Sequence, residues 1–158
     1  MSFFFSRKKI YILIFLFSLT IISSVLYIEF ILGQKPCVLC VYQRIPFVLA
    51  LFICFVGYNY SKADNILILL IAIFILSIII SGYHFGIENN IFKEFSGCSV
   101  NNTEATSKTE ILKSLQNMPS SCKEVNFTLF GLSLSGLNFL SSLIVAIYCI
   151  RTLVYEKN

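Results

Sequence analysis

The cysteines are the residues of this chain whose type and spacing could do chemistry. Two residues separate Cys37 from Cys40, a spacing that makes a reactive dithiol and closes a loop too small to add useful stability. Cys98 and Cys122 lie further along, in a polar stretch. Four cysteines allow three pairings, and the sequence alone does not choose among them. The chemistry favours Cys37 with Cys40 and Cys98 with Cys122, which predicts thiol–disulfide exchange.

A zinc site and purely structural bridges are the alternatives to redox chemistry. Four thiolates can form a zinc cage, but such cages normally use two closely spaced pairs, and here only Cys37 and Cys40 are close. Haem attachment needs a histidine after the second cysteine, where this chain has Val41. We therefore expect no metal ligands, and we keep a membrane metal-binding or scaffold protein as the alternative function.

The residues around the close pair predict how it is positioned. Pro36 can open a helix because its missing N–H is not needed in the first turn, so both sulfurs are expected in that turn, where the helix dipole stabilises a thiolate. Arg44 then falls on the same face as the two cysteines. A charged guanidinium at the membrane border is expected to bind a polar ligand head beside the pair, or else a lipid phosphate. We expect a kink at Pro46.

Composition places the chain in a membrane. Apolar residues make up 57% of it and charged residues 13%, which excludes a soluble enzyme and a disordered tail. The basic residues are scattered, so no nucleic-acid footprint is present. Four apolar stretches can span a bilayer, which predicts an all-α membrane protein, a four-transmembrane-helix bundle forming one integral membrane domain over residues 1–158. The predicted spans are about 10–32, 41–60, 66–83 and 134–154. Cys54 and Cys149 lie within them and should be inert.

Short basic flanks predict the orientation. Arg7, Lys8 and Lys9 precede the first span, whereas most basic residues of the other side lie dispersed in a long loop, which counts for less. Both termini should therefore be cytoplasmic, with the loops at about 33–40 and 84–133 on the oxidising side. Within the second loop, Ser107 to Glu110 reads as a capping box, which predicts a short amphipathic surface helix ending before Pro119.

The run from Lys35 to Arg44, KPCVLCVYQR, resembles the signature of the bacterial disulfide bond formation protein B (DsbB) family. The resemblance covers nearly the whole chain, and Gly131 to Ser135 resembles a further family segment before the last span. A quinone reductase of the vitamin K epoxide reductase type is a second reading within the same reaction class. That family has its Cys-x-x-Cys pair at the start of the last span, where this chain has only Cys149, and we therefore set it aside.

The resemblance implies a thiol:quinone oxidoreductase of the bacterial inner membrane. Cys98 and Cys122 would form the disulfide that oxidises a periplasmic thioredoxin-fold partner (DsbA), with Cys98 in the mixed disulfide. Electrons would pass to Cys37 and Cys40 and then to a membrane quinone, either ubiquinone or menaquinone. Arg44 would help to hold the quinone ring.

Two further polar residues stand at the predicted membrane border. His84 and Glu88 lie at helical spacing in a Tyr-His-x-Gly-x-Glu stretch seen in many members of the family. Because a lone histidine is more often interfacial than catalytic, we expect His84 to be an interfacial residue. Glu29, near the outer end of the first span, is expected to be solvated. The chain has no Trp, although relatives often have one in the long loop.

Overall fold

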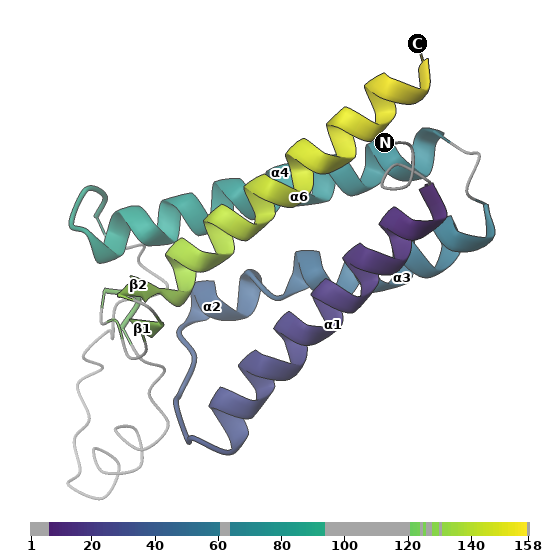
Figure 1. Cartoon of the computed structure of the whole chain (residues 1–158). Helices are drawn as coiled ribbons and strands as arrows, with labels where there is room; N and C mark the ends of the chain where they lie inside the picture. Colours follow the sequence, from purple (N-terminus) through teal and green to yellow (C-terminus); the bar gives the residue numbers. More distant parts are fainter. Residues whose placement is uncertain are drawn as a thin grey trace, which may run out of the picture.

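The computed structural model describes residues 7–60, 64–93, 121–123, 125, 128–129 and 131–157. The described elements are five helices and one short hairpin: α1 (Arg7–Phe30), α2 (Val38–Tyr42), α3 (Ile45–Asn59), α4 (Asp64–Glu88), β1 (Thr128–Leu129), β2 (Leu132–Ser133) and α6 (Leu134–Lys157). Four segments are long and apolar enough to cross a membrane: Arg7–Phe30, Val38–Asn59, Asp64–Glu88 and Leu134–Val154. The predicted all-α class with four spanning helices is thus confirmed (Figure 1).

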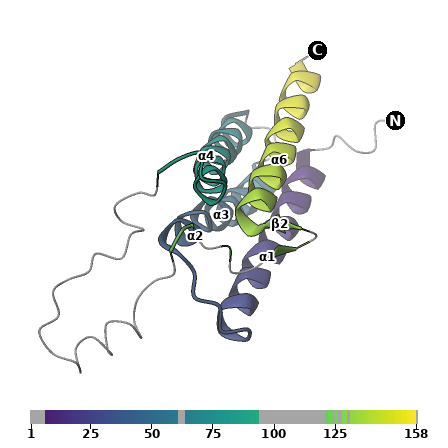
Figure 2. The same ribbon diagram turned by 90° about the vertical axis from the view of Figure 1, so that its left-hand side faces the viewer.

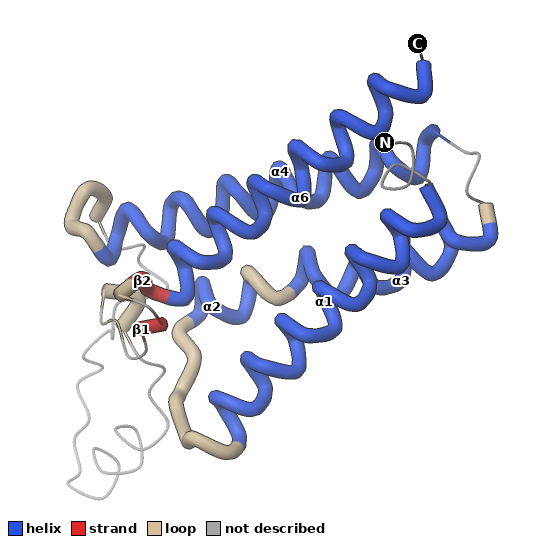
Figure 3. The backbone as a smooth tube through the Cα atoms, viewed as in Figure 1, coloured by secondary structure: helices blue, strands red, loops and turns tan. Residues whose placement is uncertain are grey.

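The helices pack as two antiparallel pairs joined along one side. Helix α4 lies along α6 and α1 lies along α3, while α3 and α4 connect the two pairs (Figures 1 and 2). The first turn of α1 and the last turn of α6 lie at the same end of the bundle. The start of α2, the end of α4 and the β1–β2 hairpin lie at the opposite end (Figure 3). Chain segments that are distant in sequence therefore meet at one mouth of the bundle.

Small residues allow close approach within each pair. A Cβ at Gly57 of α3 would lie 2.7–2.9 Å from ring atoms of Tyr11 of α1, and a Cβ at Gly136 of α6 would lie 3.1 Å from the ring of Phe85 of α4. Ser77 and Ser142 join α4 to α6 by a hydrogen bond of 2.9 Å. Helices in lipid gain little from the hydrophobic effect between them, so such packing and hydrogen bonds are what hold them together.

The helix after Pro36 begins later than that proline predicts, although three residues before the predicted start of the span at about 41. Cys37 is the N-cap residue and Val38 the first residue of α2, so Pro36 precedes the cap. Of the two cysteines, only Cys40 lies in the first turn, and the expectation that both do was wrong. The span is interrupted where predicted: α2 ends at Tyr42, and α3 starts with Pro46 in its first turn, since proline cannot donate the backbone hydrogen bond that would continue the helix.

Helix α4 continues to Glu88, five residues past the predicted end at Tyr83. The prediction ended the span where the sequence becomes polar. His84 and Glu88 are nevertheless helical because their side chains face protein rather than lipid: they are 3% and 8% exposed. The amphipathic helix predicted after Ser107 lies outside the described residues.

Replacing Gly57 by valine should destabilise the bundle, because the added methyl groups would meet the buried ring of Tyr11. Overpacking costs about 1–3 kcal/mol. The temperature at which heating the purified protein in detergent removes its gel-filtration peak should therefore fall by roughly several degrees. Val56→Leu, on the exposed face of the same helix, is the control and should change little. Equal losses in the two variants would contradict close packing at Gly57.

Candidate redox site

The sulfur of Cys37 is placed by the start of α2. As the N-cap residue, Cys37 accepts a hydrogen bond at its sulfur from the backbone N–H of Cys40, 3.2 Å away. The sulfurs of Cys37 and Cys40 lie 2.8 Å apart, and when Cys37 is the thiolate the Cys40 thiol donates a hydrogen bond to it. Both cysteines are free thiols in this structure. The two-residue spacing thus brings both sulfurs into contact, with Cys37 as the acceptor.

These contacts favour the thiolate form of Cys37. The hydrogen bond from Cys40 is the largest cause of the lowered pKa of the Cys37 thiol. Burial opposes it by disfavouring the charged form, and a hydrogen bond from His84 adds to the effect of Cys40. Together they lower the pKa of the Cys37 thiol to about 5. At neutral pH Cys37 is therefore a thiolate, both a nucleophile and a good leaving group.

His84 reaches this site from α4. Its Nε2 lies 3.6 Å from the sulfur of Cys37, and its side chain is 3% exposed. Glu88, one turn later, has a carboxylate oxygen 3.6 Å from the same nitrogen and accepts a hydrogen bond from Ser135. The expectation of an interfacial His84 was wrong, because tertiary packing buries the ring against Cys37.

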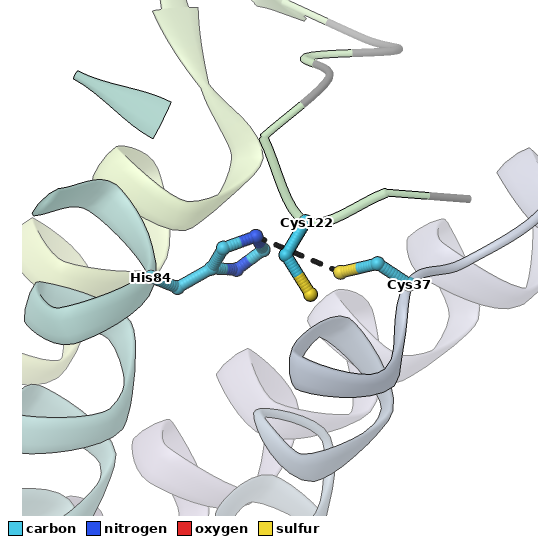
Figure 4. Close-up of side chains that lie close together, drawn as sticks. All are labelled: Cys37, His84 and Cys122. Atoms are coloured by element: carbon cyan, nitrogen blue, oxygen red, sulfur yellow. Dashed lines mark hydrogen bonds between the residues drawn. The ribbon is translucent and has the colours of Figure 1, made fainter. Parts of the chain in front are cut away.

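Cys122 completes the cluster from the segment that precedes the hairpin (Figure 4). Its sulfur, the sulfur of Cys37 and a ring nitrogen of His84 all lie within 4.8 Å of one another, and all three residues are buried. Such spacing could suit a metal ion. However, Cys122 is disulfide-bonded, and so lacks the free thiolate that zinc uses. Cys98, its predicted partner, lies outside the described residues.

A cavity of about 840 Å³ adjoins the two thiols. Its surface is mostly apolar, and its lining includes Cys37, Cys40, Arg44, Glu29 and Phe47. The volume and the few polar groups are typical of a site for a small organic molecule. Arg44 lines the same cavity as the pair and forms an ion pair with Glu29 of α1. Glu29 was expected to be solvated; its side chain is 26% exposed, and it is paired with Arg44.

Comparison with known proteins agrees with this geometry. The family model for disulfide bond formation protein DsbB matches residues 7–152. The chain belongs to the DsbB family. The uncharacterized protein RP370 of Rickettsia prowazekii (strain Madrid E) is 26% identical over 155 residues, which cover 96% of this chain and 90% of that protein. The chain is accordingly a multi-pass membrane oxidoreductase of disulfide bond formation.

Two site residues of this DsbB-family chain were not anticipated from the sequence. The Gln43 amide nitrogen lies 2.9 Å from Nδ1 of His84, and Asn138 of α6 donates to the Gln43 carbonyl oxygen over 3.1 Å. Gln43 stands within the family signature, and that position was the only available signal. Asn138 lies inside an apolar span, where a polar residue should prompt a search for a partner.

The remaining described cysteines of the DsbB fold take no part in this cluster. Cys54 and Cys149 are 1% and 0% exposed in the apolar core of the bundle. Both are free thiols, as the prediction of inert core residues requires.

The thiolate character of Cys37 predicts how its alkylation depends on pH. In the reduced protein, the rate of iodoacetamide labelling of Cys37, followed by mass spectrometry, should be nearly constant at neutral pH and fall to half at about pH 5. Below that pH the sulfur is protonated and unreactive. Cys40→Ala removes the main stabilising hydrogen bond and should raise the midpoint, whereas Cys54→Ala should not. A wild-type labelling midpoint at about pH 8.5, the pKa of an unperturbed thiol, would contradict the stabilised thiolate at Cys37.

Proposed function

We propose that this chain is a thiol:quinone oxidoreductase that oxidises a DsbA-like periplasmic dithiol partner and passes the electrons to a membrane quinone. The proximity of Cys122 to the Cys37–Cys40 pair carries the proposal. The disulfide-bonded Cys122 has its sulfur within 4.8 Å of that of Cys37, and Cys37 and Cys40 line an apolar cavity. Disulfide exchange and electron delivery to an apolar acceptor can thus share one site.

In the first half of the cycle a partner thiolate attacks Cys98 of a Cys98–Cys122 disulfide. A mixed disulfide with the partner forms, and Cys122 leaves as a thiolate. Cys122 then attacks Cys37 of a Cys37–Cys40 disulfide, so that a Cys122–Cys37 bond forms and Cys40 leaves as a thiolate. The distance between Cys122 and Cys37 supports this attack without a large movement.

In the second half the partner's other thiolate resolves the mixed disulfide and releases Cys98. Cys98 attacks Cys122, the Cys98–Cys122 disulfide re-forms, and Cys37 leaves as a thiolate. The lowered pKa of Cys37 makes it a good leaving group in this step. Two electrons have then moved from the partner to Cys37 and Cys40. Free thiols at Cys37 and Cys40 together with a disulfide-bonded Cys122 are the arrangement expected of this state.

The residues of the cavity fit a quinone. Its mostly apolar surface suits an isoprenoid-bearing ring, and Arg44 supplies a donor for a carbonyl oxygen. A quinone, when bound, accepts two electrons and two protons as the thiols return to a disulfide. Arg44 would orient that ligand, while Cys40, at the cavity wall, would be the thiol that faces it.

The proposed orientation follows from this chemistry. The cluster lies at the mouth of the bundle opposite to the first turn of α1 and the last turn of α6 (Figure 1). Disulfides persist in oxidising compartments, so we propose that this mouth faces the periplasm and that both termini are cytoplasmic. The protein would then be an inner-membrane enzyme that acts on the periplasmic side.

Turnover should require Cys40 but not Cys54. Protein in nanodiscs, given a reduced thioredoxin-fold partner and a soluble quinone analogue, should reduce the quinone, as measured by loss of its absorbance. Cys40→Ser removes a redox thiol and should abolish the reaction, whereas Cys54→Ala changes a buried core thiol outside the site and should leave the rate nearly intact. Full turnover by Cys40→Ser, or stoichiometric zinc in the anaerobically purified protein, would refute the proposal.

Arg44→Ala should raise the KM for the quinone analogue by roughly tenfold, because a charge-assisted hydrogen bond contributes about 1.5–3 kcal/mol. The KM for the thiol partner should change much less, since the partner reacts at the loop cysteines. Arg7→Ala removes an ion pair with Asp64 at the opposite end of the bundle and is the matched control. Equal changes in both Michaelis constants would assign Arg44 a structural role instead.

A further inference from the structure

We propose that two buried side-chain amides, Gln43 and Asn138, hold His84 in the tautomer that carries its proton on Nε2. His84 would thereby be a hydrogen-bond donor to the Cys37 sulfur and not a base that removes its proton. The proposal deepens the role of Cys37 given above, but its test requires neither partner nor quinone. Gln43 and Asn138 would be positioning residues, acting through His84.

The chain of hydrogen bonds begins in α6. The hydroxyl of Ser142 donates to the carbonyl oxygen of the Asn138 side chain over 3.1 Å. The amide nitrogen of Asn138 donates in turn to the carbonyl oxygen of Gln43, also over 3.1 Å. A side-chain amide has one donor end and one acceptor end, so each bond determines the orientation of the next group.

The hydrogen bond between the Gln43 amide and His84 decides which ring nitrogen carries the proton. The nitrogen of Gln43 lies 2.9 Å from Nδ1 of His84, and an amide nitrogen can only donate. Nδ1 must therefore be the acceptor, which places the proton of a neutral imidazole on Nε2. That nitrogen lies 3.6 Å from the sulfur of Cys37 (Figure 4). It also lies 3.6 Å from a carboxylate oxygen of Glu88. Both neighbours are acceptors for its proton.

Burial makes the reversal of a single amide in this chain costly. Gln43 is 7% exposed, His84 3% and Ser142 0%. With little water to replace a lost bond, reversing one amide alone would place two donors or two acceptors face to face, which leaves buried groups unsatisfied at a cost of about 1–3 kcal/mol each. The groups come from three separate parts of the fold, the α2–α3 turn, α4 and α6, so the arrangement is a property of the assembled bundle.

The arrangement restricts what His84 can do. While the Gln43 amide donates to Nδ1, that nitrogen is not available to remove a proton from the Cys37 thiol. The ring can donate from Nε2 to the thiolate form of Cys37, as the stabilised thiolate requires. His84 would therefore act on Cys37 as a hydrogen-bond donor that keeps the sulfur ready as a nucleophile and leaving group.

Two substitutions should reverse the chain. Gln43→Glu replaces the donor by a carboxylate, which requires a proton on Nδ1. Asn138→Asp acts from one bond further away: a carboxylate there accepts from the Gln43 amide, and the amide then turns its carbonyl oxygen toward Nδ1. Both variants should move the ring proton to Nδ1 although Asn138 does not contact His84. A merely structural role of Asn138 would not produce this change.

The single histidine of the chain allows a direct measurement. Full-length protein labelled with ¹⁵N-histidine, reduced with dithiothreitol, free of quinone and held in nanodiscs near neutral pH, should give nitrogen chemical shifts of an Nε2-protonated ring. The shifts of Gln43→Glu and Asn138→Asp should be those of an Nδ1-protonated ring. Asn59→Asp, the same change at an exposed position at the end of α3, should match the wild type.

A wild-type ring protonated on Nδ1 would overturn the proposal. A wild-type Nε2 tautomer that persists in both variants would do so as well, because the amides would then not control it. Gel filtration identifies any variant that does not fold, and one folded variant suffices for the comparison. If the nitrogen chemical shifts agree with the expected tautomers but quinone turnover fails, the result counts against the proposed function alone.

Discussion

The hydrogen bonds that converge on the sulfur of Cys37 are the interaction on which this site depends. A backbone N–H at the start of α2, the Cys40 thiol and the His84 ring all point to one atom. Each donor favours negative charge on that atom, while burial alone would oppose it. The site is therefore reactive because three donors outweigh desolvation, and the removal of any one shifts the balance.

The membrane explains why the donors can be held in place. Inside lipid, polar side chains have no water to bind and must find partners on neighbouring helices. Ser77 and Ser142 join α4 to α6, and Asn138 extends from the same face of α6 to Gln43. Hydrogen bonds that hold the bundle together thus continue into the site. Structural stability and the orientation of His84 share the same groups.

The charges of Arg44 and Glu29 at the cavity are paired for a related reason. Their side chains are 21% and 26% exposed, and each neutralises the other. The pairing lowers the cost of a guanidinium beside an apolar cavity and keeps it available for a polar ligand. Glu88 is likewise not isolated, since it accepts from Ser135 and lies near His84.

The sequence by itself determined the parts of this protein that depend on local order: four spans, two neighbouring cysteine sulfurs and a helix break at Pro46. Helix length, cysteine spacing and proline chemistry act between near neighbours, so they can be read directly. Where a boundary depended on what a side chain faced, as at the end of α4, the prediction stopped too early.

Only the tertiary structure decided which polar residues join the site. His84 meets Cys37 across 47 positions of sequence and Asn138 meets Gln43 across 95. Such contacts have no local pattern, because they depend on which helix faces lie together after the bundle has packed. An isolated histidine or asparagine in an apolar run shows only that a partner is needed, and the packing of α4 against α6 and of the α2–α3 turn against both selects that partner.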